Sequence, residues 1–587
     1  MIAWRANACA AVAVLAIALT TAATAQIGAP RRLIPQDDAS GTGGTIPVPG
    51  LPGVSVPPLG TPRLRDDAVR DEGALKPLNT GAIGLLDERN GGLPASLWAG
   101  STRRVIDPLL AAVTPARLPA LRDLTRRALA SSGAPPTDEA TPAALDFVAL
   151  RARGLFRLGD REAAGNLADR VSRNHADETA RAVSRDVLFL APDPAPSCDL
   201  VREAIALYTQ PDWQAALIAC QTLQGDATRA QLGLTMLREQ NAEEDDWLDR
   251  LVAFASGAKR ALEGSRRELK PHHLALFAAG KTPPPAAALD ASGPAVLAAI
   301  ALNESFPSDA RLRAAEAAVA AHALPGETLA ALYDSVTLSA RETADAMALA
   351  ERERGPRARA ALFKVVKSQT PGLPRAEALG KAMQIAERRG VAIAFRRAVL
   401  DLALEIPPAS ESAPHAGVIA RLLLGEGRTQ EASRWFDLLR LGSGIGEDGP
   451  SLAPLLYLGG AADRNLISPE ALRSWRDAQG TAGSPRVLSR TRLLAELLDA
   501  LGAASNELTT SGTGSPVAAP AQLIRLSRAA SQRHVGETLL LASAALNEAS
   551  LRDNPTAIGA VVRALREVGL ADDARAVALD AALAAGL

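Results

Sequence analysis

Histidines are the first residues to consider for catalysis or metal binding, because imidazole takes part in both. The chain has six of them, and only His272 and His273 are neighbours. Adjacent residues on a helix point about 100° apart, so we interpret this pair as polar residues at a helix start after Pro271 rather than as ligands. The remaining histidines are isolated in the sequence: His175, His322, His415 and His534. We therefore expect no metal site and no cofactor.

Sequence motifs for catalysis are also missing. Residues 444–449 match G-x-G-x-x-G, but a helical pattern precedes them and Pro450 follows, so the strand-to-helix context of a dinucleotide site is lacking. No phosphate-binding loop, H-E-x-x-H, G-x-S-x-G or C-x-x-C motif occurs. The acidic residues 243–246 complement the positive start of the next helix, and ligands within one helical turn do not converge on a cation. Acidic residues are abundant and an acid/base pair remains open, but we predict that the chain is not an enzyme.

Two cysteines flank a predicted helical hairpin. Cys198 and Cys220 stand at the far ends of two apolar-periodic segments that are separated by Pro211 and Asp212. Proline does not fit inside a helix and aspartate is a good residue to start one, so the segments predict two antiparallel helices. The cysteines then face each other, which predicts a disulfide. The alternative is two buried thiols at a helix interface.

The N-terminus has the three parts of a secretory signal peptide over residues 1–25. Arg5 is the positive region, residues 8–19 are apolar, and Ala23 and Ala25 form the cleavage site. The alternative is an N-terminal membrane anchor. Cleavage removes Cys9 and leaves two cysteines, an even number suited to an oxidising compartment. We predict a periplasmic protein with no transmembrane segment in the mature chain.

Composition sets the fold class and excludes some partners. The 587 residues carry a formal net charge of −1, so no overall field attracts nucleic acid or an acidic membrane. Alanine and leucine are abundant and aromatic residues make up only 3%, which favours helices over sheets. Apolar residues recur at three- and four-residue spacing from residue 105 onward. We predict an all-α fold of stacked antiparallel helical hairpins.

Proline- and glycine-rich stretches divide the chain. After the signal peptide, residues 26–80 form a linker predicted to be disordered, because such a composition buries too little apolar surface. The predicted units that follow are a helical region over 81–285, a second helical region over 286–505, a flexible linker over 506–520 and a C-terminal helical unit over 521–587. Residues 81–103 include Trp98, which we expect to pack onto the first helices, with surface recognition as the alternative.

Three helical turns share the pattern L-x3-G-x4-A. In this pattern the leucine packs in the last turn of one helix, the glycine forms a left-handed cap, and the alanine lies where the next helix crosses closest. The three sets are Leu155, Gly159 and Ala164; Leu423, Gly427 and Ala432; and Leu565, Gly569 and Ala574. The cysteine hairpin has Leu207, Pro211 and Ala216, with proline in place of glycine.

This pattern resembles the turn region of tetratricopeptide-type helical repeats. Trp213 stands where those repeats favour an aromatic residue, whereas the spacing between the four copies is irregular. The resemblance implies an α-solenoid, a superhelix whose concave face binds a peptide or protein.

The function predicted from these observations is an exported periplasmic scaffold that binds an as yet unidentified envelope protein or peptide without catalysis. One alternative is an enzyme that acts on the peptidoglycan cell wall, or its helical superstructure domain, although Glu537 lacks a recognisable surrounding motif. A structural spacer is the third possibility.

Overall fold

The spacing of alanine and leucine along the chain produces helices throughout. The computed structural model describes residues 80–136, 144–172, 177–240, 245–257, 262, 267–441, 448–481, 483–503, 506–508, 521–548 and 553–587. These residues form twenty-nine α-helices and no β-strand, which confirms the predicted all-α class. The signal peptide with Ala23 and Ala25, linker residues 26–79 and residues 509–520 lie outside the described residues.

The first helices follow one another along the chain, most of them joined by short connections. They are α1 (Arg103–Ala111), α2 (Pro119–Ala130), α3 (Ala144–Leu158), α4 (Arg161–Ser172) and α5 (Glu178–Phe189). Helix α3 packs against α4, and α4 packs against α5. Because the connections are short, neighbouring helices run antiparallel, as the sequence predicts for hairpins.

The segment before α1 contains two 3₁₀-helices, η1 (Thr80–Ala82) and η2 (Glu88–Asn90). Trp98 follows them and is completely buried, with its ring 5.3 Å from that of Phe147 in α3 in an edge-to-face arrangement. The predicted packing of Trp98 onto the first helices is confirmed. Its alternative role in surface recognition is wrong, because no part of the ring reaches solvent.

The next helices contain the cysteine pair. They are α6 (Ala195–Ala204), α7 (Pro211–Leu223), α8 (Ala227–Glu239), α9 (Asp246–Ala255) and α10 (Pro271–Ala279). Helix α10, the last of this group, contacts α7 and α9 and also α5, which precedes the group.

The middle of the chain continues the helical succession. It comprises α11 (Ala286–Ala291), α12 (Pro294–Leu302), α13 (Ser308–Ala320), α14 (Gly326–Ser335), α15 (Ala340–Ala344), α16 (Ala346–Arg352), α17 (Pro356–Ser368), α18 (Leu373–Arg388), α19 (Ala392–Ala398), α20 (Leu400–Leu404) and the 3₁₀-helix η3 (Ser410–His415). The predicted boundary at residue 285 falls at the start of α11. All described residues belong to one compact unit, Leu75–Leu587.

The remaining elements reach the C-terminus. They are α21 (Ala416–Leu424), α22 (Thr429–Leu441), α23 (Asp448–Leu458), η4 (Arg464–Ile467), α24 (Pro469–Ala478), α25 (Pro485–Ala500), η5 (Asn506–Leu508), α26 (Ala521–Ser531), α27 (Val535–Asn547), α28 (Pro555–Glu567) and α29 (Ala571–Ala584). The short helix η5 lies at the start of the predicted linker 506–520, and its Leu508 is buried.

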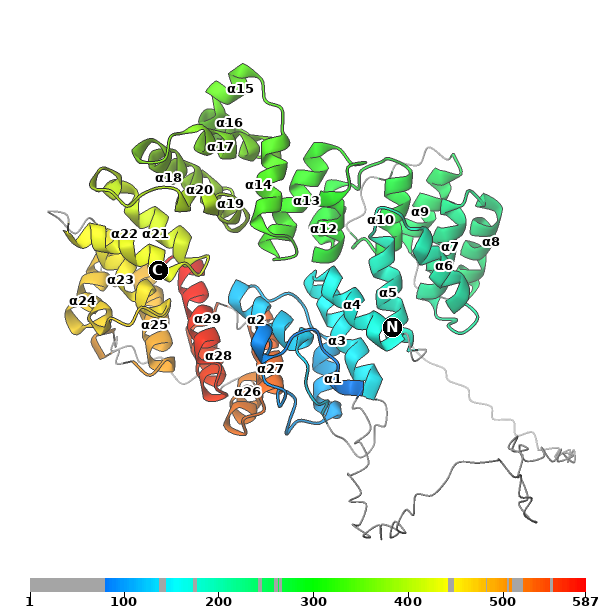
Figure 1. Cartoon of the computed structure of the whole chain (residues 1–587), viewed down its shortest axis with the longest axis horizontal. Coiled ribbons are helices and arrows are strands. Elements are labelled where there is room, and N and C mark those ends of the chain that lie inside the picture. Colours follow the sequence, from blue (N-terminus) through cyan, green and yellow to red (C-terminus); the bar gives the residue numbers. More distant parts are fainter. Residues whose placement is uncertain are drawn as a thin grey trace, which may run out of the picture. The chain divides into compact units, whose positions relative to one another are not determined.

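The first and last helices of the described chain pack against each other, as Figure 1 shows for α2 beside α27 and α29. We call this contact of α1 and α2 with α27 and α29 the terminal seam. The Gly536 N–H donates to the Leu97 carbonyl over 2.8 Å. Asp580 of α29 accepts a hydrogen bond from the Ala120 N–H over 2.6 Å. The sequence pattern contains no signal for this long-range contact.

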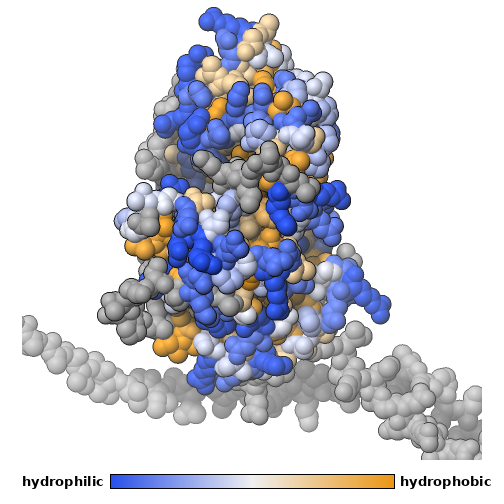
Figure 2. Space-filling model, turned by 90° about the vertical axis from the view of Figure 1, so that its left-hand side faces the viewer, coloured by the Kyte–Doolittle hydropathy of each residue, from blue (hydrophilic) through white to orange (hydrophobic). Residues whose placement is uncertain are grey.

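The surface of the described residues is mixed. On the face that Figure 2 shows, hydrophilic residues are interspersed with smaller apolar groups. Within the described part of the chain, no helix combines the length and apolarity needed to cross a lipid bilayer.

Candidate functional site

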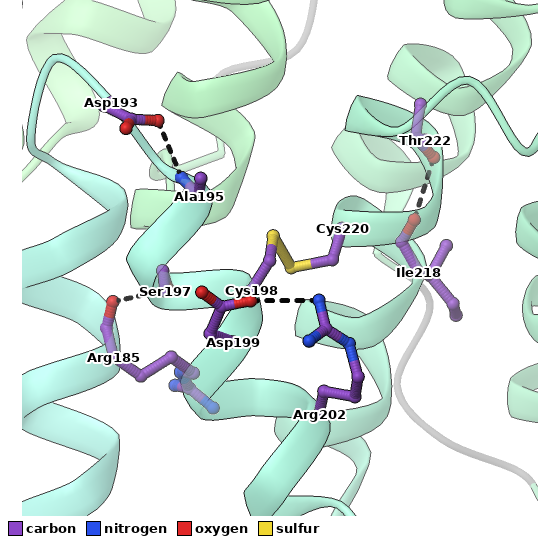
Figure 3. Close-up of a disulfide and its surroundings, with 10 residues drawn as sticks. All are labelled: Arg185, Asp193, Ala195, Ser197, Cys198, Asp199, Arg202, Ile218, Cys220 and Thr222. Atoms are coloured by element: carbon purple, nitrogen blue, oxygen red, sulfur yellow. Dashed lines mark hydrogen bonds and ion pairs between the residues drawn. A yellow bond between two sulfur atoms is a disulfide. The ribbon is translucent and has the colours of Figure 1, made fainter.

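The predicted disulfide joins α6 to α7. Cys198 and Cys220 are bonded, with their Cα atoms 5.5 Å apart, and both side chains are buried. Figure 3 shows the bridge between the two helices, beside the ion pair of Arg202 with Asp199. In the same apolar cluster as the cysteines, Tyr208 stacks on Trp213 with ring centres 5.4 Å apart. The disulfide is confirmed, and its burial among apolar groups fits a structural cross-link.

The three L-x3-G-x4-A turns have a common geometry. Gly159, Gly427 and Gly569 have φ angles of +96°, +70° and +91°, the left-handed region in which a side chain would be strained. The leucines and alanines of the pattern are all buried in the structure: Leu155, Ala164, Leu423, Ala432, Leu565 and Ala574. These residues pack the hairpins α3–α4, α21–α22 and α28–α29.

The turn of the cysteine hairpin is different. Ala216 is buried, but Leu207 is 62% exposed, so the prediction that Leu207 packs in the last turn of a helix is wrong. Pro211 is the first residue of α7, and it holds Gln210 in an extended conformation instead of providing a left-handed cap. Helix α6 ends at Ala204, before Leu207, and Tyr208 packs into the core in the place expected for Leu207.

Asp212 also has a role that the sequence did not indicate. It does not cap α7; instead it forms an ion pair with Arg185 of α5. The Arg185 side chain is almost completely buried, lies 4.6 Å from the centre of the Trp213 ring and also pairs with Asp186 over 2.8 Å. Burial alone would raise the pKa of Asp212, but the charge of Arg185, its hydrogen bond and smaller effects of neighbouring groups together lower the pKa to about 2. This pair fixes the hairpin to α5.

The histidine pair and the acidic segment meet in the structure. His272 and His273 lie at the start of α10, as predicted, but both are buried. The Nε2 atom of His273 is 3.0 Å from Oδ1 of Asp245, and Nε2 of His272 is 4.0 Å from Oδ2. Asp245 caps α9 by accepting from the Leu248 N–H. The sequence prediction treated the two segments separately and missed this contact, because it joins two different helices.

The residue types of this cluster are those of a metal site, but the hydrogen-bonding pattern does not suit one. The Lys270 N–H donates to Nδ1 of His273 over 3.1 Å, so the ring carries its proton on Nε2, the atom that faces Asp245. A neutral imidazole cannot bind a metal through a protonated nitrogen. In addition, Nζ of Lys270 lies 3.2 Å from Oδ2 of Asp245. We therefore interpret the cluster as a charge contact that joins α9 to α10.

The pKa shifts agree with this interpretation. Burial would raise the pKa of Asp245, but contacts with His273, His272 and Lys270 hold it below its usual range. Burial and the neighbouring His273 hold the pKa of His272 well below its usual value. The carboxylate is therefore ionised, and His272 is neutral.

An open recess with a volume of about 650 Å³ lies where hairpins from distant parts of the chain meet. We call it the arginine recess. Its charged lining residues come from α2, from the α3–α4 turn and the start of α4, and from α19: Arg122, Asp123, Arg126, Asp160, Arg161, Glu162 and Arg397. His322, in the α13–α14 turn, also lines it. Gly159 permits the close approach, because a Cβ there would lie 2.5 Å from the Cβ of Ala323.

The arginine recess is positively charged around His322. Burial and the charge of Arg397 lower the pKa of Arg122 to about 10. Burial and the nearby arginines, of which Arg397 and Arg122 contribute most, lower the pKa of His322 to about 3. Asp123 and Asp160 are both paired with Arg126, over 3.0 Å and 3.5 Å, and Glu162 also lines the recess, so its four arginines outnumber its three acids by one.

Two glutamates bear on the alternative of a cell-wall enzyme, since such enzymes need a carboxyl group free to act on the substrate. Glu316 is buried, but it accepts hydrogen bonds from the Tyr333 hydroxyl over 2.7 Å and from Nε of Arg359 over 2.6 Å. Glu537 accepts from the Ser101 hydroxyl over 3.0 Å at the terminal seam. Both carboxylates are thus engaged in packing contacts. No protein-family model matches the chain, and no curated protein is significantly similar to it.

Proposed function

We propose that this chain is an exported, non-catalytic helical scaffold of the bacterial cell envelope that binds another envelope protein or an extended peptide. The observation that carries the proposal is a set of large apolar side chains exposed on α8 and before α7. Leu207, Leu232 and Met236 are 62%, 60% and 52% exposed. Leu232 and Met236 are four residues apart in α8 and therefore share one face of the helix. Exposed apolar side chains on a common face favour a protein contact.

The helices that carry these exposed side chains are held in place by a disulfide and an ion pair, which favours binding. The disulfide joins α6 to α7, and α7 packs against α8. Arg185 anchors the same hairpin to α5 through Asp212. A surface held in place in the free protein loses less conformational entropy when a partner binds.

The tetratricopeptide-like α-solenoid is part of the proposal. Its support is the shared turn geometry of α3–α4, α21–α22 and α28–α29, in which a left-handed glycine is followed by a buried alanine. Repeated hairpins of this kind create long surfaces suited to extended partners.

Location in the periplasm is likewise proposed. The disulfide supports it, because disulfides persist in oxidising compartments and are rare in the cytosol. The signal-peptide pattern of residues 1–25 points to the same compartment.

The test begins with capture of partners from envelope extract by the purified chain, with cross-linking and mass spectrometry. Binding of the purified dominant partner is then measured for Leu232→Asp and for Ile524→Asp. Both residues are 60% exposed, and Ile524 lies on α26, so it is a matched control. We expect Leu232→Asp to weaken binding about tenfold or more and Ile524→Asp to leave it unchanged.

Equal binding by the two variants would contradict the role of α8. Recovery of glycan fragments without a protein partner would contradict the scaffold and support the cell-wall enzyme instead.

A further inference from the structure

The arginine recess contains more guanidinium groups than its own acids neutralise. Arg122 is only 8% exposed and donates to the carbonyls of Ala320 and Ala116, while its Nε atom has no hydrogen-bond partner among the described residues. Arg397 donates to the Val319 carbonyl over 3.0 Å and lies 3.6 Å from Glu426. The carbonyl contacts hold the two arginines in place. Glu426 offsets part of the charge of Arg397, whereas Arg122 forms no ion pair with any of the described residues.

Other groups on the recess wall have free hydrogen-bonding capacity. Arg161 makes one long hydrogen bond of 3.3 Å to the Leu190 carbonyl, which leaves most of its guanidinium donors unused. His322 has a φ of +58°, a backbone conformation uncommon for residues other than glycine. This conformation ends α13, with the N–H groups of His322 and Ala323 donating to the carbonyls of Val319 and Ala318. An oxyanion in this recess would accept hydrogen bonds from these groups and offset the crowded positive charge.

A second recess adjoins the first. It has a volume of about 310 Å³, and Arg161 and Ala191 line both recesses. Its wall is largely apolar and includes Phe189, Leu274 and Leu302. Leu302 is 48% exposed and therefore offers apolar surface to a ligand in this recess. Both volumes fall in the range of about 300–1,000 Å³ typical of small-molecule sites.

We propose that the two recesses together bind a small amphiphilic oxyanion, a phosphate or carboxylate headgroup attached to an apolar group. The headgroup lies among Arg122, Arg161 and Arg397, and the apolar group lies against Phe189 and Leu302. This inference goes beyond the proposed scaffold function, because the site is distinct from the apolar residues of α8. A bound ligand would connect α2 and α4 to α19 and so stabilise the contact between distant hairpins.

The experiment is isothermal titration of the full chain with octyl phosphate, octanoate and inorganic phosphate at constant ionic strength. We expect an octyl compound to bind about tenfold or more tightly than inorganic phosphate, because its chain buries apolar surface. Binding of octyl phosphate alone would assign a phosphate headgroup, and binding of octanoate alone would assign a carboxylate headgroup. Failure of both octyl compounds to bind would overturn the proposal.

Three variants locate the binding site. Arg161→Gln removes a guanidinium with a single long hydrogen bond, and we expect it to weaken binding about tenfold. Leu302→Asp should remove the advantage of the octyl chain. Arg563→Gln is the control, because Arg563 lies on α28 and is paired with Asp499 outside the recess.

The comparison of ligand binding among these variants tests whether the ligand lies in the two recesses. Equal weakening by Arg161→Gln and Arg563→Gln would show a nonspecific charge effect and overturn the assignment. Circular dichroism confirms that each variant is folded. If Leu302→Asp does not fold, an unchanged preference for octyl phosphate in Leu302→Ser would overturn the role of the apolar recess.

Discussion

The cysteine hairpin and the terminal seam both hold helices together, but they do so by different means. The hairpin is closed by one covalent bond between residues 22 positions apart. The seam is closed by noncovalent contacts between residues more than 400 positions apart, such as the bond from Ala120 to Asp580 with a separation of 460. One contact is local and covalent, whereas the other is distant and built from many weak interactions.

The physical cost of closure explains this difference. Ordering a longer loop costs more entropy, although the cost grows only slowly with loop length. The seam meets this cost by burying apolar groups, among them Trp98 against Gly536, where a Cβ would lie 2.4 Å from the Trp98 ring. It adds an ion pair of Arg127 with Asp573 at 2.7 Å. The hairpin is therefore closed by a local bond, whereas the closure of the seam depends on the packing of the rest of the fold.

The largest expected effect is at the seam. Trp98→Ala removes a fully buried ring that contacts Phe147 in α3 and lies against Gly536 in α27. We expect a loss of about 3–5 kcal/mol in the free energy of unfolding, measured by chemical denaturation. Hydrogen exchange should increase in α27 and remain slow in α6 and α7. Trp213→Ala is the matched control and should show the reverse pattern; the same exchange pattern in both variants would refute the comparison.

The second effect is at the hairpin. Replacing both Cys198 and Cys220 with alanine removes the cross-link, and we expect a loss of about 3 kcal/mol. The change should increase hydrogen exchange in α6 and α7 and leave α27 unchanged. Reduction of the native chain with a thiol should give the same local pattern. A similar rise in exchange in α27 would show that the two regions unfold together.

The third prediction concerns pH at the seam. Burial raises the pKa of Asp580 from 3.8 to about 6 in the folded chain. Because the folded pKa is above the unfolded pKa, the ionised carboxylate weakens the fold. The free energy of unfolding should therefore rise by about 3 kcal/mol as the pH falls through 6 to below 4, with most of the rise between pH 6 and pH 4.

Asp580→Asn is the control for this pH effect. An amide oxygen still accepts a hydrogen bond from the Ala120 N–H but does not ionise. Denaturation midpoints measured across this pH range should vary less in the variant. An unchanged pH dependence would assign the effect to another group.

The smallest expected effects on the free energy of unfolding are those of two ion pairs, one in the terminal seam and one next to it. Arg127 and Asp573 are 25% and 21% exposed, whereas Arg117 and Asp553 are 61% and 71% exposed and lie 2.9 Å apart. Solvent screens the second pair more strongly, so we expect Arg127→Gln to cost about 1 kcal/mol and Arg117→Gln about 0.3 kcal/mol or less. Urea denaturation of the two variants measures the difference. A larger effect at Arg117 would show that exposure does not rank these contacts.

Local features of the fold could be predicted from the sequence because their signals lie within a few residues. The apolar spacing indicated helices, the L-x3-G-x4-A pattern indicated left-handed glycines, and Cys198 and Cys220 indicated a disulfide. Leu207 was predicted incorrectly because the cysteine hairpin has a proline in place of the glycine of the pattern, and α6 ends at Ala204, before Leu207. The L-x3-G-x4-A pattern therefore failed to predict the packing at the one turn in which its glycine is replaced.

The sequence by itself determined the helices, their hairpin turns and the cysteine pairing, since each depends on neighbouring residues and on backbone geometry. Only the tertiary structure decided that Asp245 lies beside His272 and His273, that Arg122 and Arg397 share a recess, and that α2 meets α29. These contacts join segments far apart in the chain. They depend on the packing of many side chains at once, and no local residue pattern specifies that packing.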